Sequence, residues 1–301
     1  EQYLVQSTNE LLSKWTRGRG KVVGVEKDIT QLTLGAICKF MFSNDLQLEL
    51  PGMTEDITIL AKHFSRMVRQ FGLPPLSWPT PNNNEFKLAL GNLHQIIDRL
   101  IDKRIVGGEQ RNDYLQILIN AVKGGIPAYQ TRESVRDEVL AMIIAGHETT
   151  AVTLEWAFVL LSKHPDLAQK MREEINEVVK ADETLSFSHL REMKWPQAIV
   201  NETLRLYPPV WIFSRKNSQP LTLSNGMDLR AGTFIGISPY VVHRNPRLWS
   251  GSVDEFNPGR WLRKRDETEG NRDSLSSLIP FGQGKRRCVG SARAMFEAPL
   301  V

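Results

Sequence analysis

One long segment without proline constrains the fold of this chain most strongly. Residues 128–164 contain no proline, Thr131 with Ser134 gives a suitable helix start, and His164-Pro165 gives a stop. Within this span the run 139–145 is apolar on every side. Because a helix that is apolar all round lies in the middle of its protein, the sequence predicts one long buried helix.

Other helices and a small sheet are expected around this helix. Helical patterns cover residues 28–42, 85–106, 166–179 and 195–206. Asn225-Gly226 predicts a tight hairpin between residues 221–224 and 227–229, and 233–237 is a further short strand. The chain is then expected to be irregular until a final helix near Cys288. This order predicts a mainly α protein with a small β-sheet, in one domain over residues 1–301.

Composition excludes several classes of protein. The chain is 41% hydrophobic and 24% charged, which is ordinary for a globular protein. Its net charge of +4 comes without a basic stripe interleaved with aromatic residues, so no nucleic-acid partner is expected. Two cysteines, Cys38 and Cys288, are too few for a disulfide scaffold and indicate a reducing compartment.

The ends of the chain indicate a fragment. The sequence begins at Glu1 rather than Met and stops at Val301 inside a helical pattern, so we expect it to be incomplete at both ends. No stretch of it is long and apolar enough to span a bilayer. A membrane anchor preceding residue 1 stays open, and the protein is expected in the cytoplasm or attached to a membrane through such an anchor.

The segment around Cys288 carries the strongest chemical signal. Gly282 and Gly284 permit backbone conformations that other residues avoid, and a close approach to a flat partner. Helix-forming residues follow Cys288, which is therefore expected at a helix N-terminus. There the helix dipole, free N–H groups and nearby cations favour thiolate over thiol. A basic glycine turn with an incidental cysteine is the alternative interpretation of these residues alone.

The spacing of this segment resembles the haem-binding loop of the cytochrome P-450 superfamily. The five matching positions are Phe281, Gly284, Arg286, Cys288 and Gly290. The resemblance implies the cytochrome P-450 fold, an orthogonal helical bundle around a buried haem b, with Cys288 as the axial iron ligand. It also implies that Arg286 and Arg215 bind the haem propionates, as planar guanidinium suits a carboxylate. Further contacts to the haem are implied for Phe281, Gly282 and Gly290.

Two charged residues of the predicted helix 195–206 fit the same resemblance. Glu202 and Arg205 are three residues apart, which is usually a weak surface pair, but their apolar neighbours predict a buried and tightly hydrogen-bonded one. They resemble the family's Glu-x-x-Arg motif. Arg260 matches the later arginine that joins this motif, although Gly259 stands where the family usually has Glu. The resemblance implies structural roles for all three.

Polar residues interrupt the apolar centre of the long helix. The threonines in Ala145-Gly-His-Glu-Thr-Thr150 can bond back to their own helix, so this could be a satisfied polar kink. The hexapeptide also resembles the family's oxygen-activation motif. By that resemblance Ala145 and Gly146 lie over the haem, and Glu148 and Thr149 relay protons to bound oxygen. Ala145 and Thr149 would also contact the substrate.

The apolar segment 209–213 has two interpretations of equal weight. It resembles a substrate-contact region, in which Val210 and Trp211 would touch the substrate, and it could equally be plain core. His243 lies in a segment that is also common in the family, but it is assigned no chemistry.

Together these motifs imply a monooxygenase that inserts one atom of O2 into a small apolar substrate. Electrons would come from NAD(P)H through an acidic partner, a ferredoxin or a flavin reductase, that docks on the basic residues beside Cys288. A monomer is expected. Two alternatives are a haem-thiolate isomerase or dehydratase, against which Glu148 and Thr149 argue, and a non-catalytic haem-binding domain.

Overall fold

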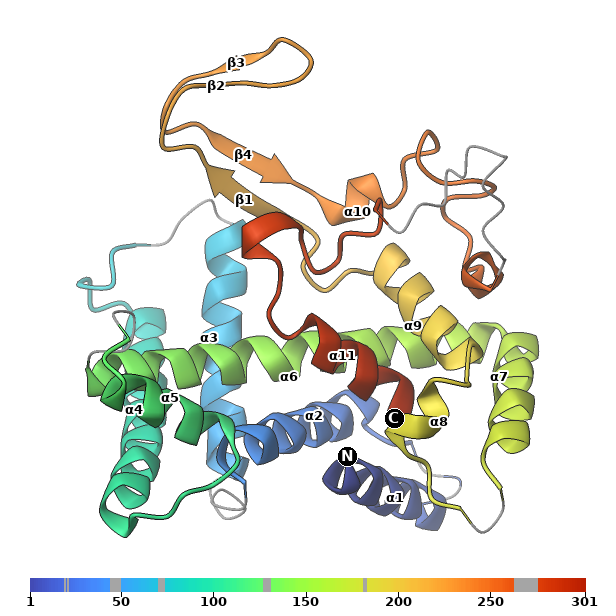
Figure 1. Ribbon diagram of the computed structural model, residues 1–301, viewed down its shortest axis with the longest axis horizontal. Coiled ribbons are helices and arrows are strands. Elements are labelled where there is room, and N and C mark those ends of the chain that lie inside the picture. The colour runs from blue at the N-terminus through green and yellow to red at the C-terminus, as the bar shows by residue number, and fades with distance from the viewer. Residues whose placement is uncertain are drawn as a thin grey trace. The chain divides into compact units, whose positions relative to one another are not determined.

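The computed structural model describes residues 1–18, 20, 22–43, 50–69, 74–126, 131–180, 183–262 and 276–301. Contacts divide the chain into two compact units, one of residues 6–151 and one of residues 1–5 with 152–301, and each is described by itself. Helices dominate both, and the strands form two small antiparallel ribbons (Figure 1). The prediction of a mainly α protein with a small sheet is confirmed.

The first unit is entirely helical in the part described. Its helices are α1 (Gln2–Arg17, whose first turn belongs to the other unit), α2 (Val25–Phe42), α3 (Leu50–Arg69), α4 (Pro81–Gly107), α5 (Tyr114–Lys123) and the first part of α6 (Arg132–Lys163). At the start of α6, Thr131 and Ser134 each donate a backbone N–H to the other's hydroxyl, at 3.3 and 3.1 Å. The long helix predicted over 128–164 is therefore confirmed, with residues 128–130 outside the described part of the chain.

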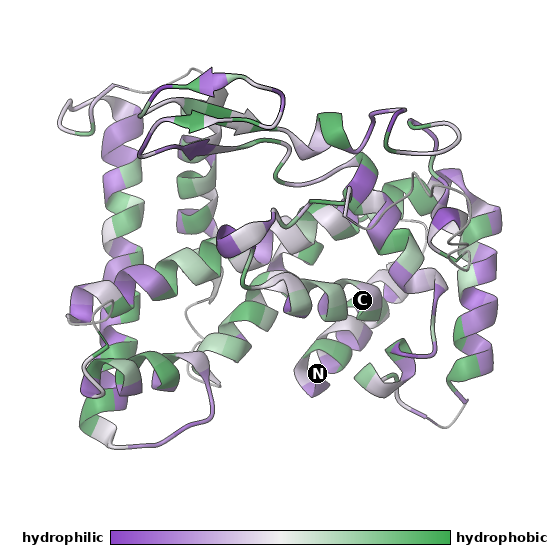
Figure 2. Ribbon diagram, turned by 45° about the horizontal axis from the view of Figure 1, so that its top comes forward, coloured by the Kyte–Doolittle hydropathy of each residue, from purple (hydrophilic) through white to green (hydrophobic). Residues whose placement is uncertain are grey.

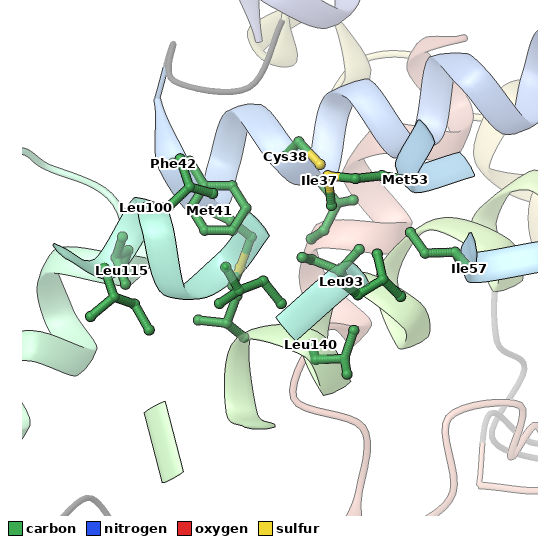
Figure 3. Close-up of a cluster of buried hydrophobic side chains, with 14 of the residues drawn as sticks. Ile37, Cys38, Met41, Phe42, Met53, Ile57, Leu93, Leu100, Leu115 and Leu140 are labelled. Atoms are coloured by element: carbon green, nitrogen blue, oxygen red, sulfur yellow. The ribbon is translucent and has the colours of Figure 1, made fainter. Parts of the chain in front are cut away.

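An apolar cluster joins the helices of this unit. Figure 3 shows side chains from α2, α3, α4, α5 and α6 pointing toward one another, among them Phe42, Ile57, Leu93 and Leu140. Cys38 is buried in the same cluster, as predicted.

A buried ion pair lies in this unit as well. Arg104 donates from both Nη atoms to the carboxylate of Asp113, at 2.8 and 2.9 Å. Asp113 also caps α5 by accepting the backbone N–H of Gln116 at 3.0 Å. Two buried opposite charges satisfy each other here, so neither is left unpaired.

The centre of α6 is not buried on every side, which corrects the prediction for residues 139–145. Val139, Leu140 and Ile143 are buried in the apolar cluster, whereas Ala141 and Ala145 are exposed. Positions 141, 145 and 148 lie on one helical face because they are four and three residues apart. Apolarity all round the segment 139–145 therefore does not mean burial here, because the face of Ala141 and Ala145 is exposed together with Glu148.

The second unit combines helices with both strand ribbons. It contains the end of α6, α7 (Pro165–Val178), α8 (Phe187–Leu190), α9 (Trp195–Leu206), β1 (Phe213–Lys216), β2 (Leu221–Thr222), β3 (Asp228–Leu229), β4 (Phe234–Ile237), α10 (Pro239–Val242), η1 (Pro258–Trp261), η2 (Gly284–Arg286), α11 (Ser291–Glu297) and η3 (Ala298–Leu300). The region expected to be irregular therefore contains the single turns α10, η1 and η2. None of the helices in the described ranges has the length and apolarity that crossing a membrane requires.

The two ribbons follow the predicted turn chemistry. β1 pairs with β4 in the register Phe213 to Ile237, and β2 pairs with β3 in the register Leu221 to Leu229. Gly226 takes a φ of +82° in the turn between β2 and β3, a conformation that glycine adopts without strain. The predicted hairpin and the strand at 233–237 are both confirmed.

Helix α9 is the best-buried element of the second unit. Ile199 and Leu206 pack with Ala157, Leu160 and Phe256 in an apolar cluster. Hydrophobic and hydrophilic residues alternate around the exposed helices, as the mixed colours of the ribbons in Figure 2 show. In α9, by contrast, the buried residues include the charged Glu202 and Arg205.

Candidate active site

A closed loop presents Cys288 to solvent. The backbone N–H of Cys288 donates to the carbonyl oxygen of Phe281 at 2.9 Å, and that of Arg287 donates to Gly284 at 3.1 Å. Gly282 N–H donates to the carbonyl oxygen of Ile279, also at 3.1 Å. These three bonds fix the backbone from residue 279 to residue 288, while the thiol of Cys288 itself is exposed. A nucleophilic atom is thus held by a defined backbone and left open to a ligand.

The glycines of this loop are needed for their backbone angles. Gly282 and Gly284 have φ values of +65° and +74°, in the left-handed region that other residues rarely adopt. A Cβ added at Gly282 would meet nothing closer than 3.9 Å, so space alone would admit a side chain there. The predicted reason for glycine, unusual backbone conformation, agrees with this geometry.

Helix α11 begins later than expected. It starts at Ser291 with Gly290 as its N-cap, so Cys288 precedes the helix rather than lying in its first turn. The residues Val289 and Gly290 form a turn between them. The predicted help from the helix dipole is therefore weaker than the sequence suggested, because this effect falls off within the first turn.

Positive charge surrounds the loop. Lys285, Arg286 and Arg287 are all exposed, and the first two lie on η2. Arg215 lies on β1, half-buried, with its guanidinium carbon 4.9 Å from the centre of the Phe213 ring. Arg215 also donates to the carbonyl oxygen of its neighbour Ser214 at 2.9 Å.

The segment before β1 is not core. Val210, Trp211 and Ile212 are 43%, 52% and 39% exposed, so the core interpretation fails for these three residues. Apolar side chains that a folded unit leaves open in this way are available to an apolar ligand or to another segment of protein.

Glu202 is the centre of a buried charge network. Its carboxylate accepts from Arg205 Nη2 and Nε at 2.8 and 2.9 Å, from Arg260 Nε at 3.1 Å and from Trp261 Nε1 at 2.9 Å. The backbone N–H of Asn257 adds a fifth bond at 3.1 Å. Glu202 and Arg205 are fully buried, and the structure brings them together with Arg260 from η1.

The two arginines of this network also bind backbone carbonyls. Arg205 donates to His243, Val253 and Glu255 at 3.0, 2.6 and 3.0 Å. Arg260 donates to Ser250 at 3.1 Å. Arg205 thereby connects α9 to the stretch 243–261, and Arg260 connects the same stretch to α9 through Glu202. These bonds satisfy charges that would otherwise be costly to bury.

His243 belongs to this region although the sequence interpretation gave it no role. It is fully buried, with Nδ1 3.1 Å from the carbonyl oxygen of Arg205 and Nε2 2.9 Å from the backbone nitrogen of Ile279. Burial lowers the pKa of His243 from 6.5 to about 4. No local motif could have revealed this role, because both partners of the ring are backbone groups far away in sequence.

The polar stretch of α6 belongs to the other unit. The hydroxyl of Thr149 donates to the carbonyl oxygen of Ala145 at 2.8 Å, and that of Thr150 donates to Gly146 at 3.3 Å. These are the back-bonds expected for a satisfied polar segment, and α6 remains one helix through them. Glu148 is exposed on the same helix. His147 is buried, and burial lowers its pKa.

The predicted site residues therefore fall into two sets. The loop of Phe281, Gly282, Arg286, Cys288 and Gly290 shares its unit with Arg215 and with the Glu202 network. Ala145, Gly146, Glu148 and Thr149 lie in the unit of residues 6–151.

Comparison with known proteins gives one consistent result. The sequence model described as cytochrome P450 matches residues 1–301. The chain is 31% identical to a cyclooctatin synthase of Streptomyces melanosporofaciens, over 95% of this chain and 61% of that protein. It is 29% identical to a cyclooctat-9-en-7-ol 5-monooxygenase of the same organism, over 99% of this chain and 63% of that protein.

A solved structure shows the same fold. The crystal structure of the cytochrome P450DA heme domain superposes with a TM-score of 0.82 at 24% identity, over 99% of this chain and 64% of that one. The chain thus spans about three fifths of the length of the proteins it matches. The match over all its residues shows that this chain belongs to the cytochrome P-450 family.

Proposed function

We propose that this chain is the larger part of a haem-dependent monooxygenase, and that its two units together form one haem domain. The observation that carries the proposal is the exposed thiol of Cys288 on a hydrogen-bonded loop, within a chain that matches the cytochrome P-450 family throughout. The name of one relative, a 5-monooxygenase, supports oxygen insertion as the reaction.

The described residues fit a haem b group. Cys288 offers a single accessible sulfur, and a thiolate ligand pushes electron density toward the iron, which favours O–O cleavage. The exposed guanidinium of Arg286 is suited to one propionate, and Arg215, which now stacks on Phe213, to the other. Gly282 and Gly290 carry no side chain that would stand between the loop and a flat ligand.

Bound haem would supply the activation of O2 and the transfer of one oxygen atom. The protein's own contribution on α6 is the delivery of protons. Glu148 carries an exposed carboxylate that can exchange protons with water, and Thr149 holds a hydroxyl one residue further along. Ala145 and Gly146 would leave room beside them, because neither has a side chain larger than a methyl group.

The substrate we propose is a small apolar organic molecule. Val210 and Trp211 expose large apolar surface directly before β1, which suits contact with such a molecule. With Ala145 and Thr149 they would form part of the substrate contacts.

The electron donor we propose is acidic and carries electrons from NAD(P)H, as a ferredoxin or a flavin reductase does. Lys285 and Arg287 are exposed beside Cys288, so their charge can steer a negatively charged donor to this face. The protein is proposed to act as a monomer in a reducing compartment, which the two free thiols of Cys38 and Cys288 support.

The test is the difference spectrum of the reduced, haem-loaded protein with CO. We expect a strongly red-shifted Soret band that is lost in Cys288→His and unchanged in Cys38→Ser, the matched control at the other cysteine. A band at the ordinary position in the unmodified protein would overturn thiolate ligation. If thiolate ligation holds, substrate oxidation coupled to NAD(P)H consumption distinguishes a monooxygenase from an isomerase or dehydratase, which consumes none.

A further inference from the structure

We infer that His243 is a positioning residue that connects the Glu202 network to the Cys288 loop and holds the loop in place for ligation. This inference rests on the proposed function for its last step, ligation by Cys288. The connection itself is visible in the protein alone, because it consists of hydrogen bonds between described residues of one unit.

The partners of the ring determine which nitrogen carries the proton. Nδ1 faces the carbonyl oxygen of Arg205, which can only accept, so Nδ1 must donate. Nε2 faces the backbone N–H of Ile279, which can only donate, so Nε2 must accept. His243 is therefore a neutral imidazole in a single tautomer. One ring nitrogen bonds to α9, and the other bonds to Ile279 in the segment that leads into the Cys288 loop.

Burial keeps His243 neutral, and the charges around it act in the same direction. Arg205 donates to the backbone carbonyl of His243 at 3.0 Å, and Arg244 follows directly in sequence, so two cations lie close to the ring. Glu202 neutralises Arg205 from the other side. Full burial is the larger cause, because a charged imidazole without water is strongly disfavoured, and the two cations lower the pKa of His243 further.

From Ile279 the connection continues to the sulfur-bearing residue in two short steps. The carbonyl oxygen of Ile279 accepts from Gly282 N–H at 3.1 Å, and the carbonyl oxygen of Phe281 accepts from Cys288 N–H at 2.9 Å. A shift of Ile279 would therefore move the residues that anchor Cys288.

Packing alone does not explain a histidine at this position. An apolar residue of similar size could fill the same volume beside Trp249, whose ring centre is 6.2 Å away. Only a side chain with a donor on one edge and an acceptor on the other can satisfy both Arg205 and Ile279. Removing either function would leave a backbone group without its partner, buried at Arg205 and partly buried at Ile279, which is costly.

Two substitutions separate the two halves of the connection. In His243→Gln the side-chain oxygen can take the place of Nε2 and accept from Ile279, while the bond to Arg205 is lost. In His243→Asn the side-chain nitrogen can take the place of Nδ1 and donate to Arg205, while Ile279 is out of reach. Both replacements are uncharged side-chain amides that differ in length by one methylene group, and this difference decides which end of the connection survives.

The first measurement is hydrogen exchange of the Ile279 amide in the full-length protein without haem. We expect exchange at this amide to be about tenfold faster in His243→Asn and close to the unmodified protein in His243→Gln, since a lost bond of about 1.4 kcal/mol corresponds to a factor of ten. Equal exchange in all three proteins, or equal acceleration in both variants, would overturn the connection.

The second measurement is the CO difference spectrum of the same three proteins after loading with haem. We expect His243→Asn to convert part of the red-shifted band to the ordinary position and His243→Gln to retain it. Identical spectra in both variants would overturn the positioning role even if the exchange result holds. Absence of the red-shifted band from the unmodified protein would instead overturn thiolate ligation, while the exchange result would still decide the connection.

Discussion

The Glu202 carboxylate and the Cys288 thiol lie in the same unit and are surrounded in opposite ways. Glu202 accepts five hydrogen bonds and has no exposed surface. Cys288 is fixed through its backbone N–H, and its side chain is exposed. The network is therefore closed to solvent, whereas the loop leaves its reactive atom available. Changes in the network should reduce stability most, whereas changes in the loop should cost less stability and act mainly on its chemistry.

The largest effect is expected for Glu202→Gln. This change keeps the shape of the side chain but leaves Arg205 buried without its carboxylate partner and removes the negative charge that Arg260 binds, which should cost about 3–5 kcal/mol in the free energy of unfolding. Urea denaturation followed by circular dichroism measures this loss. Glu173→Gln, at an exposed position of α7, is the control and should stay within about 0.5 kcal/mol of the unmodified protein.

Arg104→Leu tests whether loss of stability alone, without damage to the Glu202 network, affects the Cys288 loop. It removes one partner of the buried ion pair in the other unit, so it should cost a similar amount of stability. The molecules that remain folded should nevertheless keep the red-shifted CO band. If these folded molecules lose the red-shifted band as much as the Glu202→Gln protein does, the effect on the loop is not specific to the Glu202 network.

A smaller effect is expected from pH. The pKa of His243 is about 4 in the folded protein, compared with an ordinary value of 6.5 that applies to the unfolded chain. Between these two pH values the unfolded chain binds a proton at His243 and the folded protein does not. His243 therefore leaves stability unaffected above pH 6.5 and lowers it by about 3 kcal/mol as the pH falls to about 4. The difference between the unmodified protein and His243→Gln isolates this contribution, and parallel pH profiles of the two would contradict it.

In the loop itself, Gly284→Ala should cost about 1–2 kcal/mol. Alanine at a φ of +74° is strained, although no atom lies within 4 Å of the added Cβ. Gly91→Ala in α4 is the matched control with equally open space, and it should stabilise by about 1 kcal/mol because alanine favours a helix. Thermal unfolding of the two variants should therefore move in opposite directions, and a common direction would show that strain at Gly284 is not the cause.

The smallest effect on stability is expected when Lys285 and Arg287 are both changed to Glu. Exposed substitutions should alter the free energy of unfolding by less than about 0.5 kcal/mol, yet reduction by an acidic donor should slow about tenfold or more at low salt. Stopped-flow reduction across ionic strengths measures it, since screening should remove the difference at high salt. As a control, charge reversal at the exposed residues Lys163 and Lys180 should leave the reduction rate unchanged. If charge reversal at Lys285 and Arg287 also leaves the reduction rate unchanged, the donor does not dock there.

Much of the fold could be predicted where local chemistry decides it. α9 begins at Trp195-Pro196 and ends before Tyr207-Pro-Pro, and these residues marked both ends in advance. The burial of Glu202 and Arg205 was predictable for the same reason, since their neighbours are apolar on both sides. The short turns α10 and η1 were missed, because they are held by contacts to α9 that no local pattern records.

The parts of the site that escaped prediction depend on distant partners. His243 bonds to backbone groups 38 residues before it and 36 residues after it, and a backbone carbonyl or N–H leaves no trace in the sequence. Apolarity likewise could not decide whether Trp211 was core or exposed surface, because both are compatible with the same residues. For α6, apolarity all round suggested complete burial, whereas the face of Ala141 and Ala145 is open.

The sequence separation within the Glu202 network also has a consequence for synthesis. Glu202 leaves the ribosome 58 residues before Arg260, and at about 5–20 residues per second this takes roughly 3–12 seconds. Partners of α9 from stretch 243–261 emerge one after another within that interval, first His243 and last the donors of η1. The charge network around Glu202 therefore cannot be complete on the growing chain before η1 has emerged.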